Sequence, residues 1–187
     1  MARLHPSIAL LLDLIDEAFD HAAWHGPTLR GALRGVTARQ AAWRPARGRH
    51  TIRELTIHAA YWKYAVRRRL TGEARGSFAL AGSNWFDADA SRAWKDDVRL
   101  LVSEHRQLRE AIAAYPASAL DKRIDEKRQT AVFNIRGIAA HDLYHAGQIQ
   151  LLKRLQAGRA GRAGRARRAR RARRARWAGR ARRAAPP

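Results

Sequence analysis

The segment from about 130 to 155 carries the pattern that most constrains the fold of this chain. Its apolar and histidine side chains recur every three or four residues, the spacing of the buried face of a packed α-helix. The face comprises Ile138, His141, His145, Gln148, Leu152 and Leu155. Because such a helix must bury this face against other elements, the segment favours a helical bundle.

Two histidines, His141 and His145, lie four residues apart on that face and therefore project from the same side of the helix. Imidazoles that face an apolar interior need partners, because burying an unpaired polar group costs about 1–3 kcal/mol. A metal ion would satisfy both rings at once. The alternative is a pair of core histidines that hydrogen-bond to neighbouring groups or to water, and the spacing alone leaves both interpretations open.

Composition supports an all-α fold, since Ala, Leu and Arg are abundant and β-branched residues are scattered. The 187 residues are enough for one domain with a sizeable core. The first apolar run, residues 8–12, is short and soon followed by acidic residues, so we expect neither a membrane span nor a signal peptide, and a cytoplasmic location. Without any cysteine, a metal would have to be held by histidine or carboxylate.

The net charge of +22 is unevenly distributed. Residues 157–187 hold 13 Arg and no acidic residue, which leaves a net charge of +9 on residues 1–156. We therefore predict a folded domain over 1–156 and a low-complexity Arg/Ala/Gly tail over 157–187. With little to bury, the tail is expected to be disordered, or weakly helical on a polyanion. One interpretation is that the tail functions in non-specific binding to nucleic-acid phosphates. The other is that it is an extension under little constraint, which adheres to nucleic acid only because it is cationic.

Four amphipathic helices are predicted, at residues 6–24, 51–70, 91–115 and 130–155. The connection from 28 to 50 is expected to contain one or two helical turns. Thr37-Ala38-Arg39-Gln40 and Thr51-Ile52-Arg53-Glu54 both fit the capping box, which assigns Glu54 to a helix start rather than to a site. The loop at 72–90 is longer than a bundle requires. It either covers a site or is held down by its cluster Asn84-Trp85-Phe86.

The other histidines are each open to a structural interpretation. His58 lies beside the apolar stripe of the second helix, where a lone histidine is usually structural. His105 lies within the apolar face of the third helix, where a core histidine is favoured and a pocket role is the alternative. His21 and His25 fall in the last predicted turn of the first helix, where the helix dipole favours a cationic imidazole. His25 could also contribute to a pocket at the end of the bundle.

Taken together, several short motifs resemble the DinB-like superfamily of metal-dependent proteins. They cover nearly all of 1–156 and none of the tail, and comprise Trp24-His25-Gly26-Pro27 with Leu29-Arg30, Trp43-Arg44-Pro45, His58-Ala59-Ala60-Tyr61-Trp62 and the stretch 137–152. The resemblance implies a four-helix bundle with an up-down-down-up course, and it hints at a homodimer. It also implies a metal held by three histidines, which fall here on His58, His141 and His145.

The implied metal site suggests a chemistry. Three neutral imidazoles leave a coordination position open, as in catalytic zinc sites, where bound water has a pKa of about 7 and a bound thiol is deprotonated. Imidazole also suits nickel, iron and copper, and we expect zinc or nickel. Superfamily members include S-transferases and isomerases that use a low-molecular-weight thiol, which a chain without cysteine would need as a cosubstrate. The candidate substrate-binding residues are His25, Trp62, Trp85 and His105.

Two functions remain in competition. The first is a metal-dependent transferase or hydrolase acting on a small molecule, for which no individual catalytic residue is assigned. The second is a nucleic-acid-associated protein in which the bundle is a scaffold and the basic tail binds. Against the second, residues 1–156 show no helix-turn-helix signature and no interleaving of aromatic and basic residues.

Overall fold

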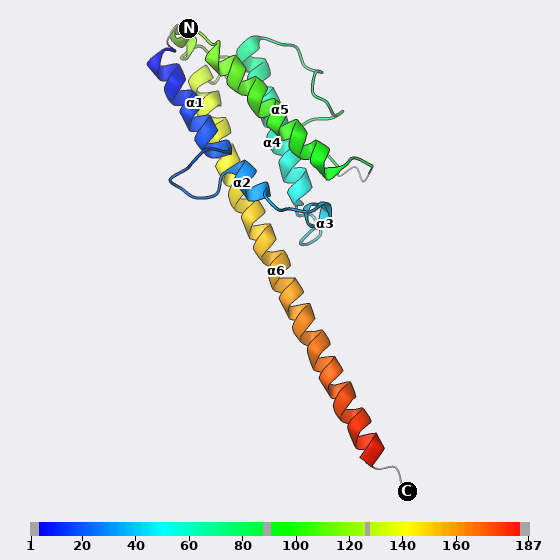
Figure 1. Cartoon of the computed structure of the whole chain (residues 1–187). Helices are drawn as coiled ribbons and strands as arrows, with labels where there is room; N and C mark the ends of the chain where they lie inside the picture. Colours follow the sequence, from blue (N-terminus) through cyan, green and yellow to red (C-terminus); the bar gives the residue numbers. More distant parts are fainter. Residues whose placement is uncertain (1–3, 88–90, 126–127, 184–187) are drawn as a thin grey trace. The chain divides into compact units, whose positions relative to one another are not determined.

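The computed structural model describes residues 4–87, 91–125 and 128–183 (Figure 1). The helices are α1 (Pro6–Phe19), α2 (Leu29–Leu33), α3 (Ala38–Ala42), α4 (Ile52–Thr71), α5 (Trp94–Ala113) and α6 (Ala131–Arg183), with a 3₁₀ turn at Ala117–Ala119. Within the described residues there is no strand, only an isolated bridge between Arg123 and Thr130. The all-α prediction is confirmed. None of the described helices has an apolar stretch long enough to cross a bilayer.

The chain divides into two compact units, residues 1–150 and 151–187. In the first unit, α1, α4, α5 and the start of α6 contribute to one apolar core, whose burial is the main force that holds these helices together. Its members include Ile8, Leu11, Ile15, Val66, Leu70, Leu108, Ile112, Ile135 and Ile138. Helix α4 lies alongside α5 (Figure 1), and α1 contacts α5 as well.

Both predicted capping boxes are present. The hydroxyl of Thr51 accepts from the Glu54 backbone N–H at 3.1 Å, and the Glu54 carboxylate accepts from the Thr51 N–H at 2.8 Å. Thr37 and Gln40 form the same reciprocal pair at the start of α3. The Glu54 carboxylate also pairs with the guanidinium of Arg44. Glu54 therefore caps the N-terminus of α4 and, through Arg44, links the preceding connection to this helix.

The first helix ends at Phe19, five residues before the predicted end. The backbone N–H groups of Asp20 and His21 still donate to the Asp16 carbonyl oxygen. Beyond them, the Glu17 carboxylate accepts from the backbone N–H of Trp24 at 3.1 Å, and Asp20 accepts from Arg30 at 2.8 Å. His21 and His25 consequently lie beyond α1, and the prediction that they occupy its last turn is wrong.

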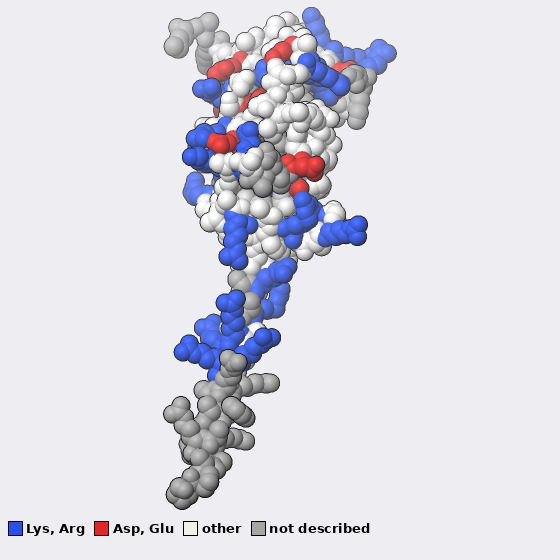
Figure 2. Space-filling model, turned by 90° about the vertical axis from the view of Figure 1, so that its right-hand side faces the viewer, with Lys and Arg blue, Asp and Glu red and all other residues white. Residues whose placement is uncertain are grey.

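The prediction of a disordered tail is not confirmed, because α6 continues as helix to Arg183. Ala and Arg are both strong helix formers, which explains why a helix is compatible with this composition. In the described part of the tail the arginine side chains are exposed, at Arg159, Arg162, Arg165, Arg167, Arg168, Arg170 and Arg171. Figure 2 shows these basic side chains following one another along that segment.

Candidate metal centre

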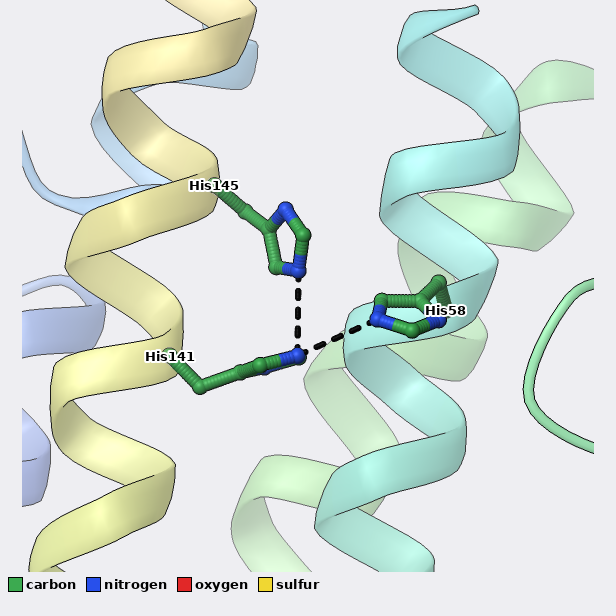
Figure 3. A group of neighbouring side chains, drawn as sticks. All are labelled: His58, His141 and His145. Atoms are coloured by element: carbon green, nitrogen blue, oxygen red, sulfur yellow. Dashed lines mark hydrogen bonds between the residues drawn. The ribbon is translucent and has the colours of Figure 1, made fainter. Parts of the chain in front are cut away.

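Three histidines from two helices meet in the first unit. His58 comes from α4, and His141 and His145 come from successive turns of α6 (Figure 3). The Nε2 atom of His141 lies 3.1 Å from Nε2 of His58 and 3.0 Å from Nε2 of His145. The three candidate ligand atoms all lie within 4.8 Å of one another, and the group could hold a metal ion.

Hydrogen bonds behind two of the rings determine which nitrogen faces the centre. Nδ1 of His58 lies 2.8 Å from the backbone carbonyl oxygen of Asn84, and Nδ1 of His145 lies 2.7 Å from Oε1 of Gln148. Because both oxygens can only accept, both Nδ1 atoms must donate. The Nε2 atoms of His58 and His145 therefore present lone pairs to the centre, the arrangement found behind histidine ligands of metals.

This donor set fits a divalent metal better than it fits a hydrogen-bonded triad. His141 can donate one proton from Nε2, so at least one of the two close contacts brings lone pairs together. Metal–nitrogen bonds of about 2.0–2.1 Å with angles between octahedral and tetrahedral values separate the nitrogens by about 2.8–3.4 Å. Two of the three separations, 3.0 and 3.1 Å, fall in that range, and the ligand atoms of the third pair lie within 4.8 Å. A cation among the three Nε2 atoms would turn the repulsion into attraction.

The surroundings keep these imidazoles neutral, the form in which they bind metals. Burial is the main cause that lowers the pKa of His58 to about 4, and burial together with the neighbouring His145 and His58 lowers the pKa of His141 to about 3. Burial also lowers the pKa of His145, although the hydrogen bond to Gln148 opposes the shift. At neutral pH the imidazoles therefore do not carry the second proton that would prevent metal binding.

Two tryptophans border the three rings. The indole of Trp85 is stacked between the imidazoles of His58 and His50, with centroid distances of 3.8 and 3.6 Å. The ring of Trp62 meets His58 and His141 edge-on, with centroids 6.3 and 6.2 Å away. Both were proposed from the sequence as pocket residues, and both lie against the candidate ligands.

The model of the DinB superfamily matches residues 7–149 of the chain, a range that contains all three histidines and stops before the tail. The chain belongs to the DinB superfamily. The resemblance stated from the sequence motifs is thereby confirmed. No curated protein matches the chain.

Asn84 is a residue of this DinB domain whose role the sequence did not reveal. Its backbone oxygen accepts from His58, and its side-chain oxygen accepts from Nε1 of Trp62 at 3.0 Å. It has a positive φ of 61°, a conformation that Asn tolerates better than most residues. The next two residues also pack through their rings: Phe86 against Tyr61 and Phe78, with centroids 5.5 and 5.3 Å away, and Trp85 against His58.

His25 and His105 lie apart from these contacts. His25 is exposed in the turn that follows α1. His105 is buried and stacked on Phe19, with centroids 3.8 Å apart. Its Nδ1 accepts from Nζ of Lys63 at 3.3 Å and its Nε2–H donates to Asp16 at 3.3 Å. These are the contacts of a core histidine, the interpretation that its place in the apolar stripe favoured.

A buried chain of charged groups continues from His105 toward the metal centre. Lys63 is 0% exposed, and its ammonium group donates to Asp142 as well as to His105. Asp142 directly follows His141 on α6. Burial raises the pKa of Asp142 to about 6, against the lowering effect of Lys63. At the other end, Asp16 accepts from Arg109 at 2.8 Å, so that the network joins α1, α4, α5 and α6 of the DinB domain.

Proposed function

We propose that His58, His141 and His145 together hold one divalent metal ion per chain and that the chain is a metal-dependent enzyme acting on a small molecule. The observation that carries this proposal is the convergence of the Nε2 atoms, two of which are fixed as lone-pair donors from behind. Three ligands leave a coordination position open, which is the arrangement of catalytic sites. Membership in the DinB superfamily supports the same ligand set.

The residues of the chain have separable roles in this proposal. The three imidazoles hold the ion, Asn84 and Gln148 orient two of them, and Trp85 shields the outer face of His58 from water. A divalent metal with an open position acts as a Lewis acid and favours the deprotonated form of a water or thiol that binds it.

We propose a thiol-dependent S-transferase or a hydrolase as the reaction class, with zinc or nickel as the metal. The thiol would be a low-molecular-weight cosubstrate, because the chain contains no cysteine. We further propose that α1, α4, α5 and the first part of α6 form the up-down-down-up four-helix bundle of the superfamily over residues 1–156, and that residues 157–187 are a functionally separate tail.

The test is a metal analysis of the purified chain and of single variants after reloading with zinc or nickel. We expect one metal ion per unsubstituted chain. In His141→Ala and His145→Ala the metal content should be near zero, and added metal should no longer raise the melting temperature. His21→Ala is the matched control, since that side chain is 65% exposed and paired with Asp20. Metal retained in His141→Ala, or lost in His21→Ala, would show that the wrong pair was chosen.

Activity provides a second test, with chelator and thiol as its variables. Turnover of any substrate should require the metal, so chelation should abolish it and added zinc or nickel should restore it. A panel of low-molecular-weight thiols distinguishes transfer from hydrolysis. Turnover that is indifferent to chelators would contradict the proposed mechanism.

We propose nucleic-acid binding by the tail as a second candidate function. From 157 to 183 the sequence repeats every three residues as Ala, then Gly or Arg, then Arg, with Trp177 as the exception. On a helix of 3.6 residues per turn, a row with this period rotates by about 60° at each repeat. The row Arg159, Arg162, Arg165, Arg168 and Arg171 therefore winds around α6 instead of forming one face. Such a helix has no apolar side to insert into a membrane, which favours a polyanion as the partner.

A further inference from the structure

A pocket of about 150 Å³ lies between α4 and α6 beside the candidate metal centre. Its walls include Trp62, Val66 and Arg69 from α4 and Phe133, Gly137 and His141 from α6. A cavity of this volume is large enough for a molecule the size of a benzene ring. The pocket therefore offers a small organic molecule a place in contact with the imidazole of a proposed metal ligand.

Most of the lining is apolar, which suits the carbon skeleton of a substrate. Of the lining residues, Val66 and Ile138 are buried and Phe133 is 57% exposed. Gly137 is exposed beside this space, and a Cβ added there would meet no atom within 4 Å, so that a larger side chain could extend into the pocket. Glycine within a helix costs about 1 kcal/mol relative to alanine. Side chains on a helix lean toward its N-terminus, so the His141 ring lies over the turn that Gly137 leaves bare.

A single cation lines the pocket among the described residues. Nη1 of Arg69 donates to Oδ1 of Asn134 at 2.9 Å and lies 3.8 Å from the Asp125 carboxylate, so that the guanidinium is held in place. The side chain is 25% exposed. A guanidinium carries five N–H donors in a planar fork that matches a carboxylate. Arg69 follows Trp62 by seven residues, which places it about 10 Å further along α4.

We infer that this pocket binds a substrate with a small apolar body and a carboxylate, and that Arg69 is the residue that recognises the carboxylate. Gly137 determines the size of the body that fits. The inference rests on the proposed function only for the reaction at the metal, because the pocket itself consists of protein side chains. A carboxylate is preferred over an uncharged polar group because only the anion combines opposite charge with two oxygens that can accept in parallel from the Arg69 guanidinium.

The experiment compares 3-phenylpropionate with its uncharged amide, 3-phenylpropanamide, by calorimetry on the full chain, both zinc-loaded and chelator-treated. We expect the acid to bind about 10- to 100-fold more tightly than the amide in both preparations. Arg69→Gln should abolish that preference and Arg69→Lys should retain part of it. Arg68→Gln is the matched control: it removes the same charge from the adjacent residue, which does not line the pocket, and should leave the preference intact.

A second pair of variants tests the pocket itself. Gly137→Leu should weaken both ligands at least tenfold by filling the space, whereas Gly137→Ala should retain binding and raise the melting temperature. Equal affinity for acid and amide in the unsubstituted chain would overturn the inference. So would a preference that requires zinc but survives Arg69→Gln, since the carboxylate would then bind the metal. If the preference persists in a chain that binds no zinc, the metal proposal fails while the carboxylate pocket stands.

Discussion

The indole ring of Trp85 lies flat on the imidazole of His58, with ring centroids 3.8 Å apart and planes inclined by 10°. The two residues come from different parts of the chain, since His58 belongs to α4 and Trp85 to the loop that follows it. The preceding residue, Asn84, holds the other nitrogen of the same imidazole through its backbone oxygen. The orientation of a proposed ligand on a helix therefore depends on two neighbouring residues of a loop.

We predict that Asn84→Ala lowers metal affinity by about 10- to 100-fold, the usual effect of removing the partner behind a histidine ligand. Alanine disfavours the positive φ at this position, so the carbonyl would turn away from His58. Asn84→Gly is the control, because glycine keeps that backbone conformation and loses only the bond to Trp62. Competition with a chromophoric chelator measures both affinities. Equal losses of metal affinity in the two variants would show that the backbone carbonyl of residue 84 is not what orients His58.

We predict that Lys63→Met destabilises the metal-free chain by about 3–5 kcal/mol, because it leaves the carboxylate of Asp142 buried without its cation. The double variant Lys63→Met/Asp142→Leu should recover most of that loss, since a buried ion pair contributes little beyond a well-packed apolar pair. Urea unfolding of the single and double variants gives both values. No recovery in the double variant would mean that Lys63 stabilises the fold mainly through His105.

We predict that His105 makes the fold less stable as pH falls. Burial, together with the charges of Lys63 and Arg109, lowers its pKa from 6.5 to about 2 in the folded chain. Between those values the unfolded chain binds a proton that the folded chain does not, so stability is fully present above pH 6.5 and decreases below it. The slope reaches at most about 1.4 kcal/mol per pH unit. The hydrogen bond to Asp16, whose carboxylate is already paired with Arg109, does not reverse this.

His105→Gln is the variant that isolates this effect. Glutamine can accept from Lys63 and donate to Asp16, as the neutral imidazole does, but it does not titrate. Its unfolding free energy, measured from pH 7.5 to 5, should decline less steeply than that of the unsubstituted chain. Parallel declines in the two chains would assign the acid sensitivity to other groups.

We predict that a chain ending after Gln156 keeps its melting temperature, because the core of the first unit lies entirely before that residue. The truncated chain should lose most of its affinity for DNA or RNA. In the full chain that affinity should fall steeply with salt, with a logarithmic slope of about −0.9 for each duplex phosphate neutralised. Titrations at several salt concentrations measure it. Sequence-selective binding that survives truncation would contradict a role confined to the tail.

The sequence was most informative where structure is determined locally. The capping boxes at Thr37 and Thr51 and the 3.6-residue stripes predicted where α3 and α4 begin and which faces they bury, because these signals depend on residues within one or two turns. The His141–His145 pair was predicted in the same way. That His58 joins them depends on how α4 packs against α6. Periodicity does not specify such packing, and the assignment came from the resemblance to the DinB superfamily.

Where prediction failed, contacts between distant residues were decisive. Gly26-Pro27 suggested that the first helix ends near residue 24, whereas it ends at Phe19, and the side chains of Glu17 and Asp20 near its end bond to Trp24 and Arg30. Asn84 was recognised only as a member of an aromatic cluster. Its role follows from a backbone oxygen in an uncommon conformation, which no residue type reveals by itself.

The one-turn spacing of His141 and His145 also bears on the order in which the protein folds. Starting a helix is the expensive step, with a nucleation constant of about 10⁻³, because several residues must be ordered for one hydrogen bond. An ion bound by both side chains would stabilise one helical turn before α4 packs against this segment, since both residues belong to the same short stretch of chain. His58 would then join a partly formed chelate. A metal bound in this way would act as a nucleus for the last helix of the domain.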